Sequence, residues 1–283
     1  MDVLSVALRA ASFVFLFQSA GLALFLELFG GEITRSRGVI QRLGVRSALW
    51  AALLALAHWA LEPARLAGEL AGLLDPDLLR TALASATGAA AGVRIAGLVL
   101  LAATLRGESR LSRWLAIAGA LLALCSFALV GHTTVRPHRW LLCMLLIAHV
   151  TVVGFWFGAL PALSIVAREE SAAATAAALR AFSAVAVWLV PGILLAGLAL
   201  AILLIGRLEV LREPYGLILI GKVSAFAVLL LLASWNRLRL TPALANAAPR
   251  ALSRLKRSVG AEYLIIVGVL AATALLTSQF SPD

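Results

Sequence analysis

The chain has 283 residues, of which 62% are hydrophobic and 13% are charged, and its mean hydropathy is +1.00. One soluble core cannot bury that much apolar surface, so the composition excludes a water-soluble globular protein and indicates an integral membrane protein. The net charge of +10 does not indicate nucleic-acid binding, because the basic residues are scattered over short loops without an aromatic-rich basic module.

Eight apolar stretches are long enough to cross a bilayer as helices, a length of about 20 residues. They are predicted near residues 4–29, 45–61, 83–105, 114–131, 141–167, 181–206, 214–235 and 259–277. The first is longer than the apolar region of a signal peptide and has no basic segment before it, so we expect it to be retained. The sequence therefore predicts an all-α polytopic bundle that forms a single integral membrane domain over residues 1–283.

Basic residues are unevenly distributed between the two sets of loops. The connections after spans one, three, five and seven carry 15 Lys and Arg residues, whereas the other three connections carry six. The positive-inside rule therefore predicts that the first set is cytoplasmic. With eight spans, both termini then lie outside, on the periplasmic side of a bacterial membrane.

The four histidines all fall in the outer half under this orientation. His58 lies near the outer end of the second span, His132 ends the fourth, His138 follows in the loop, and His149 enters with the fifth. The short loop makes spans four and five antiparallel neighbours, so His132 and His149 are expected on touching helices. An imidazole in an apolar setting needs a partner to offset its desolvation, and a ligand is the first partner to consider.

Sulfur side chains accompany these histidines. Cys125 lies seven residues before His132 on one face of the fourth span, and Met144 lies near the outer start of the fifth. Imidazole with thiol or thioether sulfur favours copper over magnesium or calcium. The predicted metal site therefore contains His132 and His149, with His58, Cys125 and Met144, although buried Cys and Met are also ordinary packing residues.

Two alternatives to copper remain open on the residues alone. Paired intramembrane histidines can supply axial ligands to a b-type haem, for which His58, His132 and His149 are the candidates in an electron carrier. The second alternative is a membrane scaffold or partner subunit that binds no ligand.

Further ionisable residues lie within or near the apolar spans. Arg94 and Lys222 are inside the third and seventh spans, and Glu27 and Glu262 are near predicted cytoplasmic ends. Such residues line transport paths or act as structural charges, and long basic side chains also reach the interface. The sequence has no Gly-x-Ser-x-Gly elbow, no His-Glu-x-x-His pair and no Walker A loop, so we expect neither a hydrolytic enzyme nor an ATP-driven transporter.

Several short motifs in chain order carry a family resemblance. They are Gly131-His132, His149 with Trp156 and Gly158-Ala159-Leu160, Gly221-Lys222 with Asn236-Arg237, and Leu255-Lys256-Arg257-Ser258-Val259 with Glu262. From the third span onward the chain resembles the copper resistance protein D (CopD/PcoD) family. One departure is Ala159, where the family often has a second glycine, which affects packing more than chemistry.

The resemblance implies a non-enzymatic copper-handling protein of the bacterial inner membrane. The expected activity is movement of copper ions from periplasm to cytoplasm in copper homeostasis or resistance. The expected partners are the copper ion, the lipid bilayer and a periplasmic copper-binding protein as donor. The sequence does not specify the oligomeric state.

Overall fold

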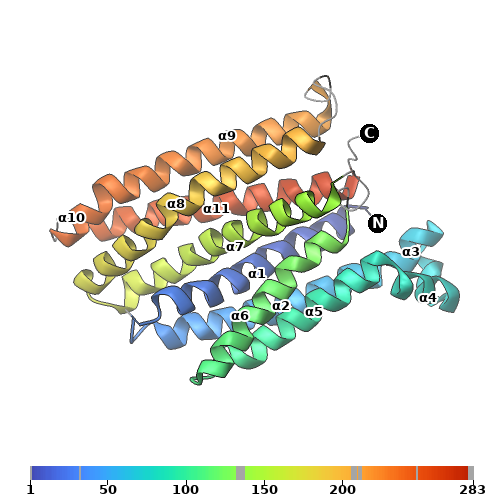
Figure 1. The fold of residues 1–283 in the computed structure, drawn as a ribbon, viewed down its shortest axis with the longest axis horizontal. Helices are drawn as coiled ribbons and strands as arrows, with labels where there is room; N and C mark the ends of the chain where they lie inside the picture. Colours follow the sequence, from blue (N-terminus) through green and yellow to red (C-terminus); the bar gives the residue numbers. More distant parts are fainter. Residues whose placement is uncertain are drawn as a thin grey trace.

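The chain forms a bundle of long helices (Figure 1). The structure is a computed structural model, and it describes residues 2–31, 33–131, 138–204, 209, 212–246 and 248–279. No strand occurs among these residues, and eight helices are long and apolar enough to cross a membrane. The predicted all-α fold with eight spans is confirmed.

The spans are built on eight long helices. They are α1 (Asp2–Phe29), α2 (Arg37–Ala60), α5 (Ala86–Thr104), α6 (Arg110–Cys125), α7 (Arg139–Glu169), α8 (Ala172–Leu204), α9 (Pro214–Trp235) and α11 (Ala251–Gln279). Shorter elements join them, namely α3 (Glu62–Ala67), η1 (Leu70–Leu74), α4 (Pro76–Ala84), η2 (Ser126–Leu129), η5 (Asn236–Leu240) and α10 (Thr241–Ala245).

Successive long helices run in opposite directions, so both ends of the chain lie at one end of the bundle (Figure 1). We call this the terminal end, and it also carries α3 and α4 (Figure 1). The opposite end carries the α1–α2, α5–α6 and α7–α8 connections together with α10. This arrangement is the one that an even number of spans requires.

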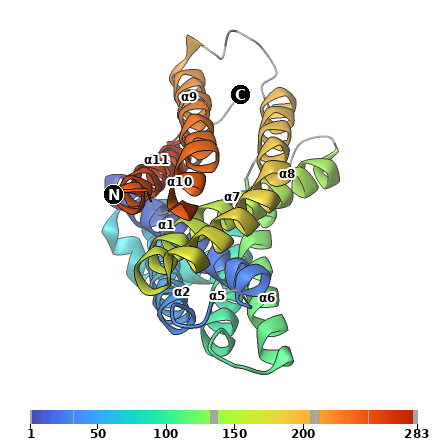
Figure 2. The same cartoon turned by 90° about the vertical axis from the view of Figure 1, so that its left-hand side faces the viewer.

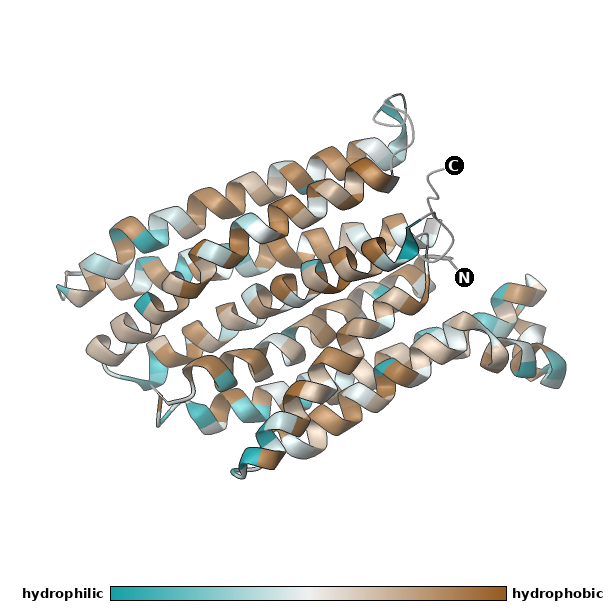
Figure 3. Cartoon of the chain, viewed as in Figure 1, coloured by the Kyte–Doolittle hydropathy of each residue, from teal (hydrophilic) through white to brown (hydrophobic). Residues whose placement is uncertain are grey.

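The helices are apolar along most of their length, and many of the hydrophilic residues lie toward the helix ends (Figure 3). Large side chains such as Trp188 of α8 and Leu231 of α9 are 81% and 72% exposed. A water-soluble protein does not present such a continuous apolar exterior, but a bilayer solvates it. The chain is therefore a multi-pass membrane protein.

Helix α1 lies at the centre of the bundle, in contact with α2, α6, α7 and α11. It meets α7 most closely at Gly21, which faces a Gly-x-x-x-Gly pair formed by Gly154 and Gly158. A Cβ atom built on Gly158 would lie 2.4 Å from the carbonyl carbon of Gly21. Small residues at this spacing let two membrane helices touch backbone to backbone.

A chain of polar side chains joins three helices inside the core. The Tyr263 hydroxyl of α11 donates to Gln18 Oε1 of α1 at 2.7 Å, and Gln18 Nε2 donates to Ser47 Oγ of α2 at 2.7 Å. The Tyr263 ring also stacks on Phe157 of α7, with 4.7 Å between ring centroids. Because each polar group has a partner, the network fixes helix register without leaving these groups unsatisfied.

At the opposite end, Glu170 fastens the α7–α8 connection to the start of α2. Its Oε1 atom accepts hydrogen bonds from the backbone amides of Thr34, Arg35 and Ser36 at 2.9 to 3.1 Å, and from the Ser36 hydroxyl at 2.9 Å. The Ser36 amide, followed by the Ser36 hydroxyl and the other two amides, holds the pKa of Glu170 below its usual range.

Three helices begin eight or nine residues earlier than the apolar stretches predict, and one of them is α8, which starts at residue 172 instead of 181. Helix α2 starts at residue 37 instead of 45, and α11 starts at residue 251 instead of 259. The added turns contain Arg37 and Arg42 in α2, and Arg254, Lys256 and Arg257 in α11. Hydropathy marks where the apolar segment begins, whereas a helix continues through basic residues that reach the interface.

Candidate functional site

His149 lies in α7, ten residues after Arg139, with its imidazole against α8. The imidazole Nδ1 is 3.3 Å from the carbonyl oxygen of Ile193, two residues after Pro191. A Cβ on Gly197, one turn further along α8, would lie 3.2 Å from His149 Cε1. Glycine at this position therefore makes room for the ring between the two helices.

This hydrogen bond determines which ring nitrogen of His149 is available for a ligand. When Nδ1 carries the proton and donates to the Ile193 carbonyl, Nε2 keeps its lone pair. Metal-ligating histidines commonly have this arrangement, in which a backbone carbonyl holds the second ring nitrogen. Among the described residues Nε2 forms no hydrogen bond, so the lone pair is available to a metal ion.

Lys222 of α9 acts electrostatically on His149. Helix α9 follows α8 in the chain but packs against α11, and the two consecutive helices diverge (Figure 2). An ammonium group near the imidazole opposes a bound cation at this position. His149 thus has the geometry of a metal ligand, whereas the positive charge of Lys222 weakens the binding of a cation there.

Polar and aromatic side chains continue from this point toward the opposite end. Trp156 lies two turns after His149 on the same face of α7, and its ring meets Phe226 of α9 edge-on at 6.1 Å. The Trp156 indole is also a side-chain donor to Glu262 of α11. Asn236 Nδ2 donates to the same carboxyl group at 2.5 Å. These contacts join α7, α9 and α11 along one interior face.

His58 has a different environment, near the terminal end of α2. Its Nε2 atom is buried and has no hydrogen-bond partner among the described residues. Three guanidinium groups, those of Arg9, Arg65 and Arg94, are close enough to act on it electrostatically. This much positive charge opposes a cation and makes His58 less suitable than His149 as a copper ligand.

Arg94 has partners other than a carboxylate. Its Nε donates to Ser126 Oγ at 3.0 Å, and its guanidinium carbon lies 4.5 Å from the centroid of the Phe127 ring. A hydroxyl and a cation–π contact partly replace the hydration that Arg94 loses in the membrane. These contacts support a structural role for Arg94 at the α5–η2 junction.

The sulfur atoms do not converge on His149. Cys125 is half-buried at the last residue of α6, and Cys143 Sγ in α7 is 3.7 Å from the Ala128 carbonyl oxygen. Met144 is 63% exposed on the outer surface of α7. His132 lies outside the described residues. No group of three or more His, Cys, Asp or Glu side chains suited to a metal occurs in the part of the chain that the structure describes.

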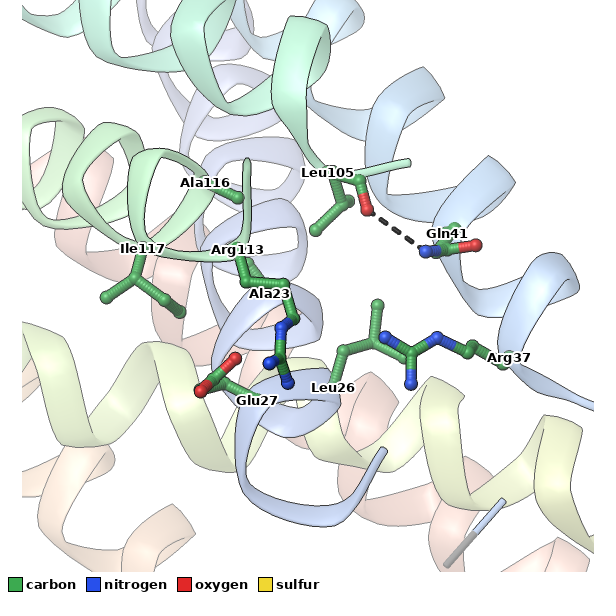
Figure 4. A pocket seen from close by; sticks show the side chains of 9 residues that line it. All are labelled: Ala23, Leu26, Glu27, Arg37, Gln41, Leu105, Arg113, Ala116 and Ile117. Carbon is green, nitrogen blue, oxygen red and sulfur yellow. Dashed lines mark hydrogen bonds between the residues drawn. The ribbon is translucent and has the colours of Figure 1, made fainter. Parts of the chain in front are cut away.

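Glu27 lies at the opposite end, where the apolar stretch of α1 ends. It lines a small pocket in which its carboxylate and the Arg113 guanidinium point into the same space, beside Arg37 and Gln41 (Figure 4). Gln41 Nε2 donates to the Leu105 carbonyl oxygen at 3.1 Å (Figure 4). Two arginines and an exposed carboxylate indicate a surface charge cluster.

Comparison with known proteins places this bundle in a family. Residues 1–137 match the model for the copper resistance protein D-like N-terminal domain, and residues 176–276 match the model for copper resistance protein D. The chain belongs to the copper resistance protein D family. It is 29% identical over 278 residues to copper resistance protein D of Pseudomonas syringae pv. tomato, which covers 91% of this chain and 89% of that protein. No solved structure matches.

The two copper resistance protein D matches extend the resemblance beyond the motifs in the sequence. They include the first two spans, where no motif pointed to the family. Residues 138–175, which contain His149 and Trp156, lie between the two matched ranges. The pairwise similarity to the Pseudomonas protein covers most of the chain, so this family assignment does not depend on His149.

Sequence reasoning missed three residues of the His149 region. Ile193 contributes only a backbone carbonyl, which no side-chain pattern reports. Gly197 is one of several glycines in an apolar helix, and its role depends on the position of His149. Asn236 belonged to a family motif, but its bond to Glu262 joins residues 26 positions apart. An Asn at the end of an apolar span was the one available signal.

Proposed function

We propose that this protein binds copper near the terminal end of the bundle and moves it through the membrane toward the opposite end. The observation that supports this most strongly is the His149 imidazole, whose Nδ1 lies against the Ile193 carbonyl oxygen while Nε2 is left for a ligand. Imidazole nitrogen suits copper, and the copper resistance protein D family supplies the cargo.

The direction of movement follows from the loop charges. The connections expected at the opposite end carry 15 of the Lys and Arg residues, and the positive-inside rule puts them in the cytoplasm. The terminal end then faces the periplasm of a bacterial inner membrane. Copper entering at His149 moves inward past Trp156 toward Glu262.

A second ligand is needed, and His132 is the strongest candidate. It belongs in the sequence to the segment between α6 and α7 and lies outside the described residues, so its candidacy rests on the sequence. Cys125 at the end of α6 is the next candidate, because its thiol is half-buried at the terminal end of the bundle. His58 and Met144 are weaker candidates, since arginines surround the former and the latter is exposed.

The donor in this proposal is a soluble periplasmic copper-binding protein that delivers copper at the terminal end. The sequence has no Walker A loop, so transport runs on ion gradients or on the membrane potential. That potential is worth about 2.3 kcal/mol for each elementary charge per 100 mV, which favours inward movement of a cation.

Metal analysis and visible spectroscopy of the purified protein test the binding step. We expect stoichiometric copper in the wild-type protein and loss of copper in the His132→Ala and His149→Ala variants. The matched control is His138→Asn, which removes a nearby imidazole while keeping a side chain that tolerates the left-handed backbone at φ 59°.

Two other results would contradict copper binding. Stoichiometric haem with the absorption bands of a b-type cytochrome would assign the histidines to iron instead. A protein that carries neither ligand, and that keeps its cellular function in both alanine variants, would be a scaffold.

A further inference from the structure

Glu262 is a buried carboxyl group in the interior of α11, and only 2% of its surface is exposed. Its hydrogen-bond partners among the described residues are two neutral donors, the Asn236 amide of η5 and the Trp156 indole of α7. The ion pairs among the described residues are Arg65–Glu62 and Arg80–Asp77, so no basic side chain there neutralises Glu262. An ionised carboxylate in this position would be an uncompensated charge inside a membrane protein.

Two further oxygen atoms beside this region lack partners. Asn236 Oδ1 and Ser258 Oγ are both buried and form no hydrogen bond in the described part of the chain. Ser258 lies one helical turn before Glu262 on the same face of α11. The nitrogen of the same amide, Asn236 Nδ2, donates a hydrogen bond to Glu262 Oε1. Such atoms call for a partner, and a protonated Glu262 carboxyl group can donate to Asn236 Oδ1 of the amide that it already contacts.

The backbone at Asn236 is also unusual. Residues Asn236–Leu240 form a π-helical turn that continues α9, and the Thr241 hydroxyl donates to the Asn236 carbonyl oxygen at 2.9 Å. Single π-helical turns within longer helices occur frequently at functional sites. Here the altered register brings the Asn236 amide to Glu262.

Several ionisable side chains of the surrounding helices interact with other groups. Tyr263 of α11 donates to Gln18, Arg237 of η5 donates to the Ser183 carbonyl oxygen, and Lys222 of α9 acts on His149 of α7. Glu27 of α1 is exposed at the pocket on the opposite end, and α10 has no ionisable residue. No charged side chain is among the described groups that act on Glu262.

The side-chain atoms around Glu262 indicate which cation this site can bind. Calcium takes six to eight oxygen ligands and magnesium about six, whereas this site offers one carboxyl group, one amide oxygen and one hydroxyl. Copper prefers nitrogen and sulfur, which the site lacks apart from the indole. A proton needs only the carboxyl group, and the Asn236 and Ser258 oxygens can each accept a hydrogen bond from the protonated form.

We propose that Glu262 is an intramembrane proton-binding site, and that copper passing from His149 displaces its proton. In this step the carboxyl O–H bond breaks, the proton leaves to water at the opposite end, and the carboxylate neutralises the passing copper cation. After the copper leaves, Glu262 takes up a proton from water at the terminal end, so each copper ion is accompanied by the net movement of one proton to the opposite end. The displacement step rests on the proposed copper transport, whereas proton binding in the resting state does not.

Infrared difference spectroscopy on the copper-free protein tests proton binding alone. At neutral pH we expect the carbonyl stretch of a protonated carboxylic acid, which is lost in Glu262→Gln and unchanged in Glu108→Gln, where the glutamate is exposed on a loop. If Glu262→Gln does not accumulate, Glu262→Asp keeps a carboxyl group and should shift the band. Absence of any band that depends on Glu262 would overturn the proposal.

Proton release on copper loading tests the displacement step. With a pH-sensitive dye inside proteoliposomes, we expect wild-type protein to release one proton for each copper ion, and Glu262→Gln to release none while keeping the copper bound at His149. Copper transport without proton release from the wild-type protein would overturn the displacement. A wild-type protein that takes up no copper contradicts the proposed function instead, and the infrared band still decides whether Glu262 binds a proton.

Discussion

The contact between α1 and α7 gives a quantitative prediction, because both helices meet there through glycine. In the Gly158→Ala variant, the new Cβ atom would lie 2.4 and 2.5 Å from the backbone carbon atoms of Gly21 and 2.5 Å from the Leu22 nitrogen. Both elements are buried helices, so no flexible side chain can move aside. The helices must separate by roughly 1 Å to restore an ordinary contact of about 3.5–4.0 Å.

This separation affects the free energy of unfolding in two opposing ways. Overpacking a filled core costs about 1–3 kcal/mol, and a clash with backbone belongs at the upper end of that range. Replacing glycine by alanine inside a helix stabilises the helix by up to about 1 kcal/mol, because alanine has the higher helix propensity. We therefore expect a net destabilisation of about 1–2 kcal/mol for Gly158→Ala. The control is Gly268→Ala in α11, where a Cβ would meet nothing within 4 Å and only the helix gain applies.

Thermal unfolding in detergent, followed by tryptophan fluorescence, measures both variants under the same conditions. Gly158→Ala should melt below the wild-type protein, and Gly268→Ala should melt at the same temperature or higher. If the two alanine variants were equally stable, the backbone contact between α1 and α7 would not exist as described.

Three other substitutions test different parts of the molecule. Lys222→Gln removes a cation whose charge acts on His149 and opposes a bound copper ion, so copper affinity measured by chelator competition should rise several-fold. Gly197→Val places a branched side chain against the His149 ring and should lower that affinity, whereas unchanged affinity would mean that the ring does not hold the metal. Glu170→Gln should destabilise the protein by about 1 kcal/mol at neutral pH. Because the folded pKa of Glu170 is lowered, its contribution is complete above the unfolded value of about 4.3 and is lost as the pH falls through the folded value, so the wild-type and variant melting temperatures should converge in acid.

The fold could be predicted from the sequence because membrane insertion depends on local composition. Each of the eight spans is a continuous apolar segment, and the bilayer requires such a segment to be helical. The span ends were less predictable, since the basic residues at the start of α2 and α11 continue the helix beyond the apolar segment. The spacing of Gly154 and Gly158 is typical of helix packing in membranes, but the contact that it makes with Gly21 was not predicted from the sequence.

The candidate site was only partly predictable. His149 was identified from the cost of an imidazole in an apolar span, which is a property of the residue itself. Its position against α8 depends on the Ile193 carbonyl and on Gly197, which are tertiary contacts without a sequence pattern. The arginines that act on His58 come from α1, α3 and α5, and no sequence pattern indicated them.

The most direct test of the account is copper uptake by proteoliposomes that contain the purified protein and a copper-sensitive dye inside. Vesicles with the terminal end outward should accumulate copper faster than protein-free vesicles. His149→Ala should abolish the difference, and His138→Asn should keep it. Uptake by the wild-type protein no faster than by empty vesicles, or full uptake by His149→Ala, would contradict copper movement through His149.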